Sequence, residues 1–373
     1  MAKYRVGVIG CGRKGGQHAR AYALNPLTEV VALADTDAEN LELYCNYFNV
    51  PGYSNYKEML EKEQIDIAAP ILPVRPNPEV VVGCAEAGVK AILCEKPLAA
   101  TLEDADRMVE ACRSRGIKFG AGDLDRNLPQ YWKAREIIES GELGDVQSIT
   151  FTGGSGTEMS GGGCQLFSLT RMFAEDADLA WAIGWVSDDP MSDHDQGVAG
   201  YMRFVNGIEA FMHRNPDARG GGFEVACSRG LFRSNNGFLQ LWKADEGVNR
   251  PTWAELQKVE GVFPDTSVYG RRSSEYDDEG WRWPGDRNMT SVQSIVDALE
   301  MDIEPRGSGD NGRKVLEMAI ALRESHRQGH APVKLPLADR SLRLFPKKSR
   351  MDNKKPQLGR ENYMPQIESK KQL

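Results

Sequence analysis

Three glycines near the amino terminus have the spacing of a pyrophosphate-binding loop. Gly10, Gly12 and Gly15 form the pattern G-x-G-x-x-G. In such a motif one glycine makes a tight turn, one lets the backbone approach a pyrophosphate, and one lets a helix pack closely on a strand. The free N–H groups at the start of the following helix then attract the phosphates. The pattern predicts dinucleotide binding, and the side chains of Arg13 and Lys14 add positive charge to the loop.

An acidic residue follows this motif at the distance that ribose recognition requires. Asp35 ends the apolar run 29–34 and comes twenty residues after Gly15. A carboxylate there accepts hydrogen bonds from both hydroxyls of an adenosine ribose and repels a 2′-phosphate. The pattern therefore favours NAD, and the positive charge of Arg13 and Lys14 keeps NADP open. The alternative is a glycine turn followed by an ordinary aspartate at a strand end.

The apolar runs around these residues alternate between strand and helix. We expect strands at 4–9, 29–34, 65–72, 89–94 and 117–121, and helices at 17–24, 38–48, 56–62, 78–87 and 102–115. This alternation is typical of right-handed βαβ units and a doubly wound parallel sheet. We therefore expect a Rossmann domain over residues 1–123. Its ligand crevice should lie at the carboxyl ends of the strands.

The pattern changes beyond residue 123. We expect further strands at 146–152, 179–186, 198–204, 209–213, 222–226 and 238–242, and helices at 131–140, 291–299 and 312–328. Alternating runs separated by glycine-rich turns predict a mostly antiparallel sheet. The expected second domain is an α/β domain over residues 124–345. The basic tail, residues 346–373, is expected to be a solvated or partner-wrapping arm.

The bulk properties narrow the classes of partner. A chain of 373 residues is expected to form two domains. The net charge of −8 argues against a nucleic-acid or anionic-membrane partner, and no apolar run reaches transmembrane length. The seven cysteines are scattered along the sequence, which indicates reduced thiols in a cytoplasm. The first predicted strand begins at once, without a separate signal-peptide segment, which also indicates a cytoplasmic protein. The cysteines and histidines lack zinc-site spacing, so we expect no metal.

Several segments together resemble the glucose–fructose oxidoreductase / inositol dehydrogenase (Gfo/Idh/MocA-type) family. They are the glycine motif, Glu95-Lys96-Pro97-Leu98-Ala99, and the stretches 126–146, 223–230 and 308–329. The resemblance implies a Rossmann domain and an α/β domain with a large, open, mainly antiparallel sheet. It also implies that this sheet is an oligomer interface, which predicts a homodimer or homotetramer. The implied reaction is NAD(P)-linked oxidation or reduction of a sugar or polyol hydroxyl.

Lys96 is the first catalytic candidate under this resemblance. It leaves the end of a core strand, where a lysine can hydrogen-bond a substrate hydroxyl and help to remove its proton as hydride departs. The alternative is a surface lysine after a strand. Glu95 is expected to position the nicotinamide side or Lys96 rather than to act as a base. Leu72, Pro73 and Asn77 are further expected cofactor contacts, and Asn77 stands where many relatives place a histidine.

The second catalytic pair of the family is missing from the expected place. Family members usually carry a glycine-rich turn that opens a helix, with an aspartate four residues past the turn and a histidine four further on. Phe167 and Arg171 occupy those two positions in the segment 161–171. Arginine cannot act as a general base at neutral pH. Either Lys96 acts alone, another residue has taken the role, or the chemistry is not simple dehydrogenation.

His194 is the candidate replacement among the five histidines. It lies in a polar loop between the carboxylates of Asp193 and Asp195, and a solvated loop histidine is the alternative. The expected substrate contacts are Lys96, Arg126, Gln165, Arg171, His194 and Trp283. An interdomain ion pair is the alternative role for Arg126. The tryptophans around Trp283 either stack on a sugar ring or anchor an irregular loop.

These patterns predict an NAD(P)-dependent oxidoreductase that transfers a hydride between nicotinamide and a ring hydroxyl. The expected substrate is a sugar, a sugar derivative or a glycoside, as for a glycoside 3-dehydrogenase. One alternative is a redox-neutral NAD-dependent glycosidase, which oxidises a ring hydroxyl transiently and cleaves the glycosidic bond by elimination. A second alternative is a non-catalytic dinucleotide-binding sensor or assembly subunit.

Overall fold

A computed structural model describes residues 3–122, 125–152, 158–213, 222–235, 238–248, 251–263, 287–346 and 351. The chain forms two compact units. One comprises Met1–Leu124, Asp277–Arg313 and Lys347–Leu373, and the other comprises Asp125–Tyr276 and Lys314–Pro346. The described helices include none that is long and apolar enough to cross a membrane.

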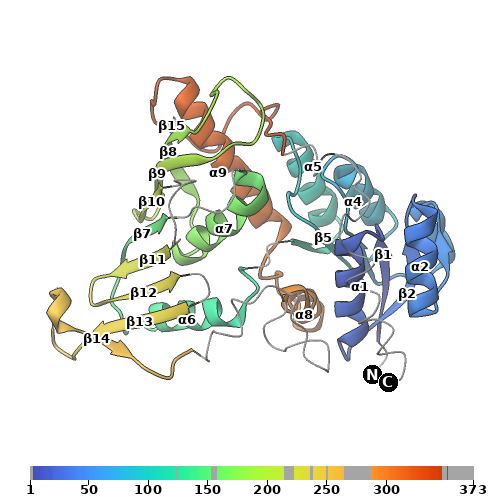
Figure 1. Ribbon diagram of the computed structural model, residues 1–373, viewed down its shortest axis with the longest axis horizontal. Coiled ribbons are helices and arrows are strands. Elements are labelled where there is room, and N and C mark those ends of the chain that lie inside the picture. The colour runs from blue at the N-terminus through green and yellow to red at the C-terminus, as the bar shows by residue number, and fades with distance from the viewer. Residues whose placement is uncertain are drawn as a thin grey trace. The chain divides into compact units, whose positions relative to one another are not determined.

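The first unit contains a six-stranded sheet with the order β3-β2-β1-β4-β5-β6 (Figure 1). Its strands are β1 (Tyr4–Ile9), β2 (Thr28–Ala34), β3 (Gly52–Tyr53), β4 (Ile67–Pro70), β5 (Ala91–Cys94) and β6 (Lys118–Ala121). All neighbouring strands pair in parallel. The chain runs outward from β1 to β3 on one side and then from β4 to β6 on the other. The predicted doubly wound parallel sheet is therefore confirmed, with its switch point between β1 and β4.

The helices of this unit lie close to the predicted ranges. They are α1 (Arg13–Leu24), α2 (Ala38–Phe48), α3 (Tyr56–Lys62), α4 (Asn77–Glu86), α5 (Leu102–Arg113) and α8 (Arg287–Glu300). Side chains of Asp37 and Thr101 accept backbone N–H groups at the starts of α2 and α5. The first helix begins at Arg13 rather than at the predicted Gln17, because Gly12 already forms its N-cap.

Helix α8 contributes to the core of the first unit. Its side chains Val292, Ile295 and Val296 are buried in one cluster with Ala19 and Tyr22 of α1. The sequence placed this stretch in the second domain, since it follows the antiparallel strands along the chain. The predicted boundaries at 123/124 and 345/346 stay a prediction.

The second unit contains a nine-stranded sheet with the order β14-β13-β12-β11-β7-β10-β9-β8-β15. Its strands are β7 (Val146–Thr152), β8 (Leu179–Val186), β9 (Val198–Phe204), β10 (Glu209–His213), β11 (Gly222–Cys227), β12 (Gly230–Asn235), β13 (Phe238–Ala244), β14 (Leu256–Val259) and β15 (Val333–Lys334). Only β7 and β10 pair in parallel among these strands. The predicted large and mainly antiparallel sheet is confirmed. Three strands that the sequence did not indicate, β12, β14 and β15, extend it.

Helices cover one face of this sheet (Figure 1). They are α6 (Pro129–Glu139), α7 (Cys164–Phe173) and α9 (Gly309–Arg327), and a single π-helical turn, Met159–Gly163, leads into α7. A cluster of aromatic rings packs beneath α7. Its members are Phe151, Phe167, Phe173, Phe223 and Phe232.

Replacing Gly184 of β8 by alanine is expected to lower the free energy of unfolding by about 2 kcal/mol or more. An added Cβ would lie 2.3 Å from the carbonyl oxygen of Leu322 in α9, so strand and helix would have to move apart. Gly222→Ala in β11 is the control, because its Cβ would lie no closer than 3.8 Å to Thr152. Denaturant titration measures both variants. Equal midpoints would contradict the close packing of β8 on α9.

Candidate functional site

The glycine motif makes a tight turn directly after β1. Gly10 has φ +97°, in the left-handed region that side chains disfavour, and its N–H donates to the carbonyl of Ala34 at 2.7 Å. A Cβ on Gly15 would lie 1.7 Å from the carbonyl oxygen of Gly10, so α1 packs against the turn as closely as backbone allows. A Cβ on Gly12, by contrast, would meet no atom within 4 Å. Backbone atoms therefore fill the space beside Gly15, whereas the space beside Gly12 is left open.

Asp35 lies at the end of β2 and is tied to this turn. One carboxylate oxygen accepts from the N–H of Cys11 inside the motif, and the other accepts from the N–H of Asp37 at 2.8 Å. Each oxygen keeps further acceptor capacity. The carboxylate is thus oriented by backbone donors and can still receive hydroxyl groups.

A buried charge cluster surrounds Glu95, the first residue after β5. Its side chain is 7% exposed, and Oε1 lies 3.0 Å from Nε2 of the fully buried His18 in α1. Oε2 accepts from the backbone N–H of Lys96 at 3.1 Å. Burial alone would raise the pKa of Glu95, but the positive charge of Lys14 and the hydrogen bond from His18 outweigh it and hold the pKa at about 2. Glu95 is therefore an ionised carboxylate within the fold.

Lys14 belongs to the same cluster. Burial lowers the pKa of its ammonium group, and the negative charge of Glu95 opposes that shift. Because Lys14 lies in the first turn of α1, its charge adds to the partial positive charge of the helix N-terminus. The arrangement favours an anionic group next to the glycine turn.

The remaining predicted cofactor residues follow β4 and β5. Leu72 packs on the glycine motif, since a Cβ on Gly10 would lie 3.0 Å from its Cδ2 atom. Pro73 comes next and is half-buried. Asn77 is fully buried, and its side-chain N–H donates to the carbonyl of Leu98 at 2.9 Å. Lys96 is half-buried at the carboxyl end of β5.

The structure puts Phe167 and Arg171 of α7 to structural use. Phe167 is fully buried, with its ring centroid 6.2 Å from that of Phe151 in an edge-on contact. Arg171 is 3% exposed and donates to the carbonyls of Asp176 and Ala177 at 3.0 and 2.9 Å. Phe167 thus belongs to the aromatic core, and Arg171 stabilises the turn that follows α7.

Two further predicted substrate residues make contacts inside the second unit. Arg126 is buried, donates to the carbonyl of Ser168 at 3.1 Å and forms an ion pair with Asp176. Gln165 is buried as well, and its side-chain oxygen accepts from the N–H of Asp125 at 2.8 Å. The ion pair considered for Arg126 therefore exists within one unit. A substrate contact by either residue stays a prediction.

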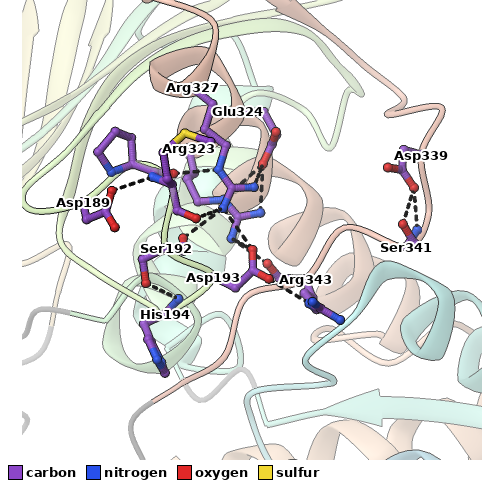
Figure 2. A network of polar contacts seen from close by, with 12 residues as sticks. Asp189, Ser192, Asp193, His194, Arg323, Glu324, Arg327, Asp339, Ser341 and Arg343 are labelled. Atoms are coloured by element: carbon purple, nitrogen blue, oxygen red, sulfur yellow. Dashed lines mark hydrogen bonds and ion pairs between the residues drawn. The ribbon is translucent and has the colours of Figure 1, made fainter.

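His194 is an exposed side chain on the loop between β8 and β9, and its backbone N–H donates to the hydroxyl of Ser192 at 3.0 Å. Figure 2 shows its ring turned away from the arginine cluster around Asp193. Trp283 and the aromatic-rich segment around it lie outside the described residues. The described part of the chain holds no group of three or more His, Cys, Asp or Glu side chains that could bind a metal.

The Rossmann unit matches the model of a known family. Residues 4–122 match the family model of the Gfo/Idh/MocA oxidoreductases, which is described as an oxidoreductase family with an NAD-binding Rossmann fold. The Rossmann unit is therefore similar to the Gfo/Idh/MocA oxidoreductases over residues 4–122, about a third of the chain. The match confirms the predicted resemblance to this family and the predicted nicotinamide dinucleotide cofactor. The open turn at Gly12, the oriented carboxylate of Asp35 and the positive charge of Lys14 fit such a group.

Relatives in sequence match about two fifths of the chain. The chain is 32% identical over 146 residues to an uncharacterized oxidoreductase of Streptococcus pneumoniae, a match covering 39% of this chain and 38% of that protein. It is 30% identical over 151 residues to the rhizopine catabolism protein MocA of Rhizobium meliloti, covering 40% and 47%. It is 29% identical over 149 residues to myo-inositol 2-dehydrogenase of Thermotoga maritima, covering 40% and 44%. The matched segment spans less than half of each relative.

Solved structures of similar fold cover both units. A levoglucosan dehydrogenase in complex with NADH and L-sorbose has a TM-score of 0.74 at 21% identity, covering 90% of this chain and all of that one. An Agrobacterium radiobacter oxidoreductase in complex with NAD+, L-tartaric acid and magnesium has a TM-score of 0.73 at 17% identity, covering 89% and 98%. These likenesses confirm the predicted fold class.

Sequence reasoning missed two aspartates of the second unit. Asp176 accepts from both Arg126 and Arg135, and Asp195 binds the turn that precedes α7. Both lie in polar stretches where aspartates are common, and their partners are distant along the chain. No local pattern marks either residue.

Two glycine variants separate folding from cofactor binding in the first unit. Gly15→Ala is expected to unfold or strongly destabilise the first unit, because the new Cβ would overlap the carbonyl of Gly10. Gly12→Ala is expected to keep the melting temperature but to weaken NAD+ binding about tenfold or more, since its Cβ would fill the space left for the pyrophosphate. Thermal melting and isothermal titration calorimetry measure the two effects. Wild-type affinity in Gly12→Ala would contradict the assigned position of the pyrophosphate.

Proposed function

We propose that this chain is an NAD-dependent oxidoreductase that transfers a hydride between nicotinamide and a ring hydroxyl of a sugar, sugar derivative or glycoside. The observation that carries the proposal is the grouping of Gly12, Asp35 and Lys96 at the carboxyl ends of parallel strands in one unit. The nicotinamide ring, when bound, supplies the hydride acceptor or donor. The residues of the chain then have to bind, orient and exchange a proton.

Binding and cofactor preference are assigned to the glycine motif and Asp35. The backbone N–H groups of Cys11 and Asp37 orient the Asp35 carboxylate. We assign to this carboxylate the role of accepting hydrogen bonds from the ribose hydroxyls. A 2′-phosphate at the same place would meet its negative charge, which favours NAD over NADP. Arg13 and Lys14 lie in the first turn of α1 and supply positive charge for the phosphates.

Proton exchange is assigned to Nζ of Lys96. In its charged form this atom donates a hydrogen bond to the substrate hydroxyl, and in its neutral form it takes up the hydroxyl proton. The backbone of Lys96 is held by the carboxylate of Glu95, which is held in turn by His18. These buried contacts fix the backbone of Lys96, and with it the start of its side chain, at the end of β5.

A second proton-exchanging group is assigned to His194. The two positions that carry the catalytic pair in relatives are built into the core and the turn after α7, as Phe167 and Arg171 show. The imidazole of His194 is exposed, and its loop is anchored on both sides. The similarity to a myo-inositol dehydrogenase and to a levoglucosan dehydrogenase supports a sugar-like substrate. Seven free cysteines support a cytoplasmic setting.

Lys96→Ala tests this assignment. Loss of the amine is expected to lower kcat about 100-fold or more while NAD+ affinity stays within a few fold, because proton transfer and not cofactor binding is removed. The formation of reduced nicotinamide is followed by absorbance, with NAD+ and a panel of sugars and aryl glycosides. Lys90→Ala, an exposed lysine of the same unit that pairs with Asp66, is the matched control. Equal kcat in wild type and Lys96→Ala would refute the role of Lys96.

The same assay separates the two alternatives. Release of the aglycone without accumulation of reduced nicotinamide would identify the redox-neutral glycosidase. Tight NAD+ binding without turnover of any panel member would favour the non-catalytic sensor or assembly subunit. Parallel measurement of His194→Ala shows whether its imidazole shares the proton transfer with Lys96.

We further propose that the chain forms a homodimer or homotetramer through the sheet of the second unit. Aromatic side chains line up across β8, β9 and β10. Tyr201 stacks on Phe211 with centroids 4.6 Å apart, and Trp181 meets Tyr201 at 5.1 Å. Phe211 is 47% exposed and Trp185 is 46% exposed. An aromatic row of this kind on a sheet face suits burial against another copy.

Phe211→Glu is expected to shift the chain toward the monomer, because a carboxylate would be buried at the contact without a partner. Sedimentation velocity measures the change. Val205→Glu is the control, since Val205 is 67% exposed beyond the end of β9 and outside the aromatic row. Retention of the wild-type oligomer in Phe211→Glu would rule out this face.

A further inference from the structure

Two half-buried lysines of the first unit, Lys14 and Lys96, share one buried carboxylate. Glu95 and Lys96 follow β5, and Lys14 lies in the first turn of α1. Because residues four positions apart lie on the same face of a helix, Lys14 lies one turn before His18 on that face. His18 is fully buried, and its Nε2 atom is 3.0 Å from Oε1 of Glu95. The helix register therefore brings Lys14 to the end of β5.

The pKa of Glu95 supports this placement. Burial raises it, and the positive charge of Lys14 has the largest effect among the groups that lower it. His18 and Lys96 lower it as well. Lys14 and Lys96 thus act on the same carboxylate from two elements of the unit, α1 and the end of β5.

Positive charge exceeds negative charge around Lys14. In the described part of the chain, neither Lys14 nor Lys96 forms a side-chain ion pair with a carboxylate within 4.0 Å. Burial lowers the pKa of Lys14, and the nearby cations that lower it further are Arg13, Lys96 and Arg287. The carboxylate of Glu95 acts in the opposite direction. Several cations therefore surround one carboxylate at this edge of the sheet.

The two redox states of a nicotinamide ring differ in charge, since the oxidised ring is a cation and the reduced ring is neutral. In the proposed function, Nζ of Lys96 exchanges the proton of a hydroxyl group whose carbon exchanges the hydride. The nicotinamide ring and Lys96 must therefore approach the same C–OH group. An excess of positive charge at Lys14 and Lys96 raises the free energy of the oxidised ring and leaves that of the neutral ring nearly unchanged.

We propose that Lys14 makes the cofactor site bind NADH more tightly than NAD+. This inference rests on the proposed function, because it requires the nicotinamide ring to bind near Lys96. Tighter binding of the reduced form raises the reduction potential of the bound couple, so the bound cofactor is a stronger oxidant than the free one. Lys14 thereby favours oxidation of the ring hydroxyl over reduction of the carbonyl product.

Attraction of the phosphates is a separate effect of the same charge. It strengthens the binding of NAD+ and NADH equally, because both carry the same pyrophosphate. It also strengthens the binding of ADP-ribose, which has the pyrophosphate and both riboses but lacks the nicotinamide ring. The ratio of the dissociation constants of NAD+ and NADH therefore reports the effect on the ring, and ADP-ribose reports the effect on the phosphates.

Isothermal titration calorimetry of the full chain with these three ligands at neutral pH tests the proposal without turnover. The wild type is expected to bind NADH about tenfold more tightly than NAD+. Lys14→Met removes the charge and keeps an unbranched side chain, so this ratio is expected to fall about tenfold. Lys14→Arg keeps the charge and should keep most of the ratio. Lys62→Met, an exposed lysine of the same unit that pairs with Glu58, is the control and should behave as the wild type.

Lys14→Gln is a second neutral variant in case Lys14→Met fails to fold, and its ratio should fall to the same extent. Thermal melting of each variant separates a structural role from the proposed one. If Lys14 only balanced the charge of Glu95 within the fold, the neutral variants would melt at lower temperature but keep the wild-type ratio.

Three results would overturn the proposal. They are a wild type that binds NAD+ as tightly as NADH, a wild-type ratio in the neutral variants, and equal weakening of all three ligands, which would assign Lys14 to the phosphates alone. A wild type that binds neither dinucleotide would contradict the proposed function as well. A lowered ratio without turnover of any sugar or glycoside would support the role of Lys14 and count against the proposed function alone.

Discussion

The contact between Gly15 and the carbonyl of Gly10 is the constraint on which the first unit depends. Only a residue without a side chain lets α1 approach the end of β1 so closely. That approach places the N-terminus of α1 beside the turn, His18 against Glu95, and Cys11 within reach of Asp35. The glycine turn, Asp35 and Glu95 are thereby gathered at one edge of the sheet from positions that are far apart in sequence.

The two units differ in the surroundings that they give to their polar and charged side chains. In the first, Glu95 stays ionised although buried, because Lys14 and His18 compensate its charge, and this charge balance supports Lys96. In the second, Phe167 of α7 packs into an aromatic core. The polar loop anchored by Asp193 and Asp195 carries the exposed side chain of His194.

Local patterns were enough to predict much of this fold, but not the contacts that join distant segments. The ranges of α2, α3 and β1 followed from periodicity and turn residues, and Asp35 followed from its spacing to Gly15. The strand β12 was missed because its short sequence ends in polar residues and lacks a clear alternation. The assignment of α8 to the second domain rested on chain order, whereas its apolar face packs on α1. Asp176 and Asp195 acquire their roles only from partners more than thirty residues away.

The most direct test of the central claim compares NAD+ and NADP+ binding by isothermal titration calorimetry in the wild type and in Asp35→Ala. The account predicts that the wild type binds NAD+ about tenfold or more tightly than NADP+, and that Asp35→Ala loses this preference. If neither dinucleotide binds, or if NADP+ binds more tightly to the wild type, the assigned roles of the glycine turn and Asp35 are contradicted.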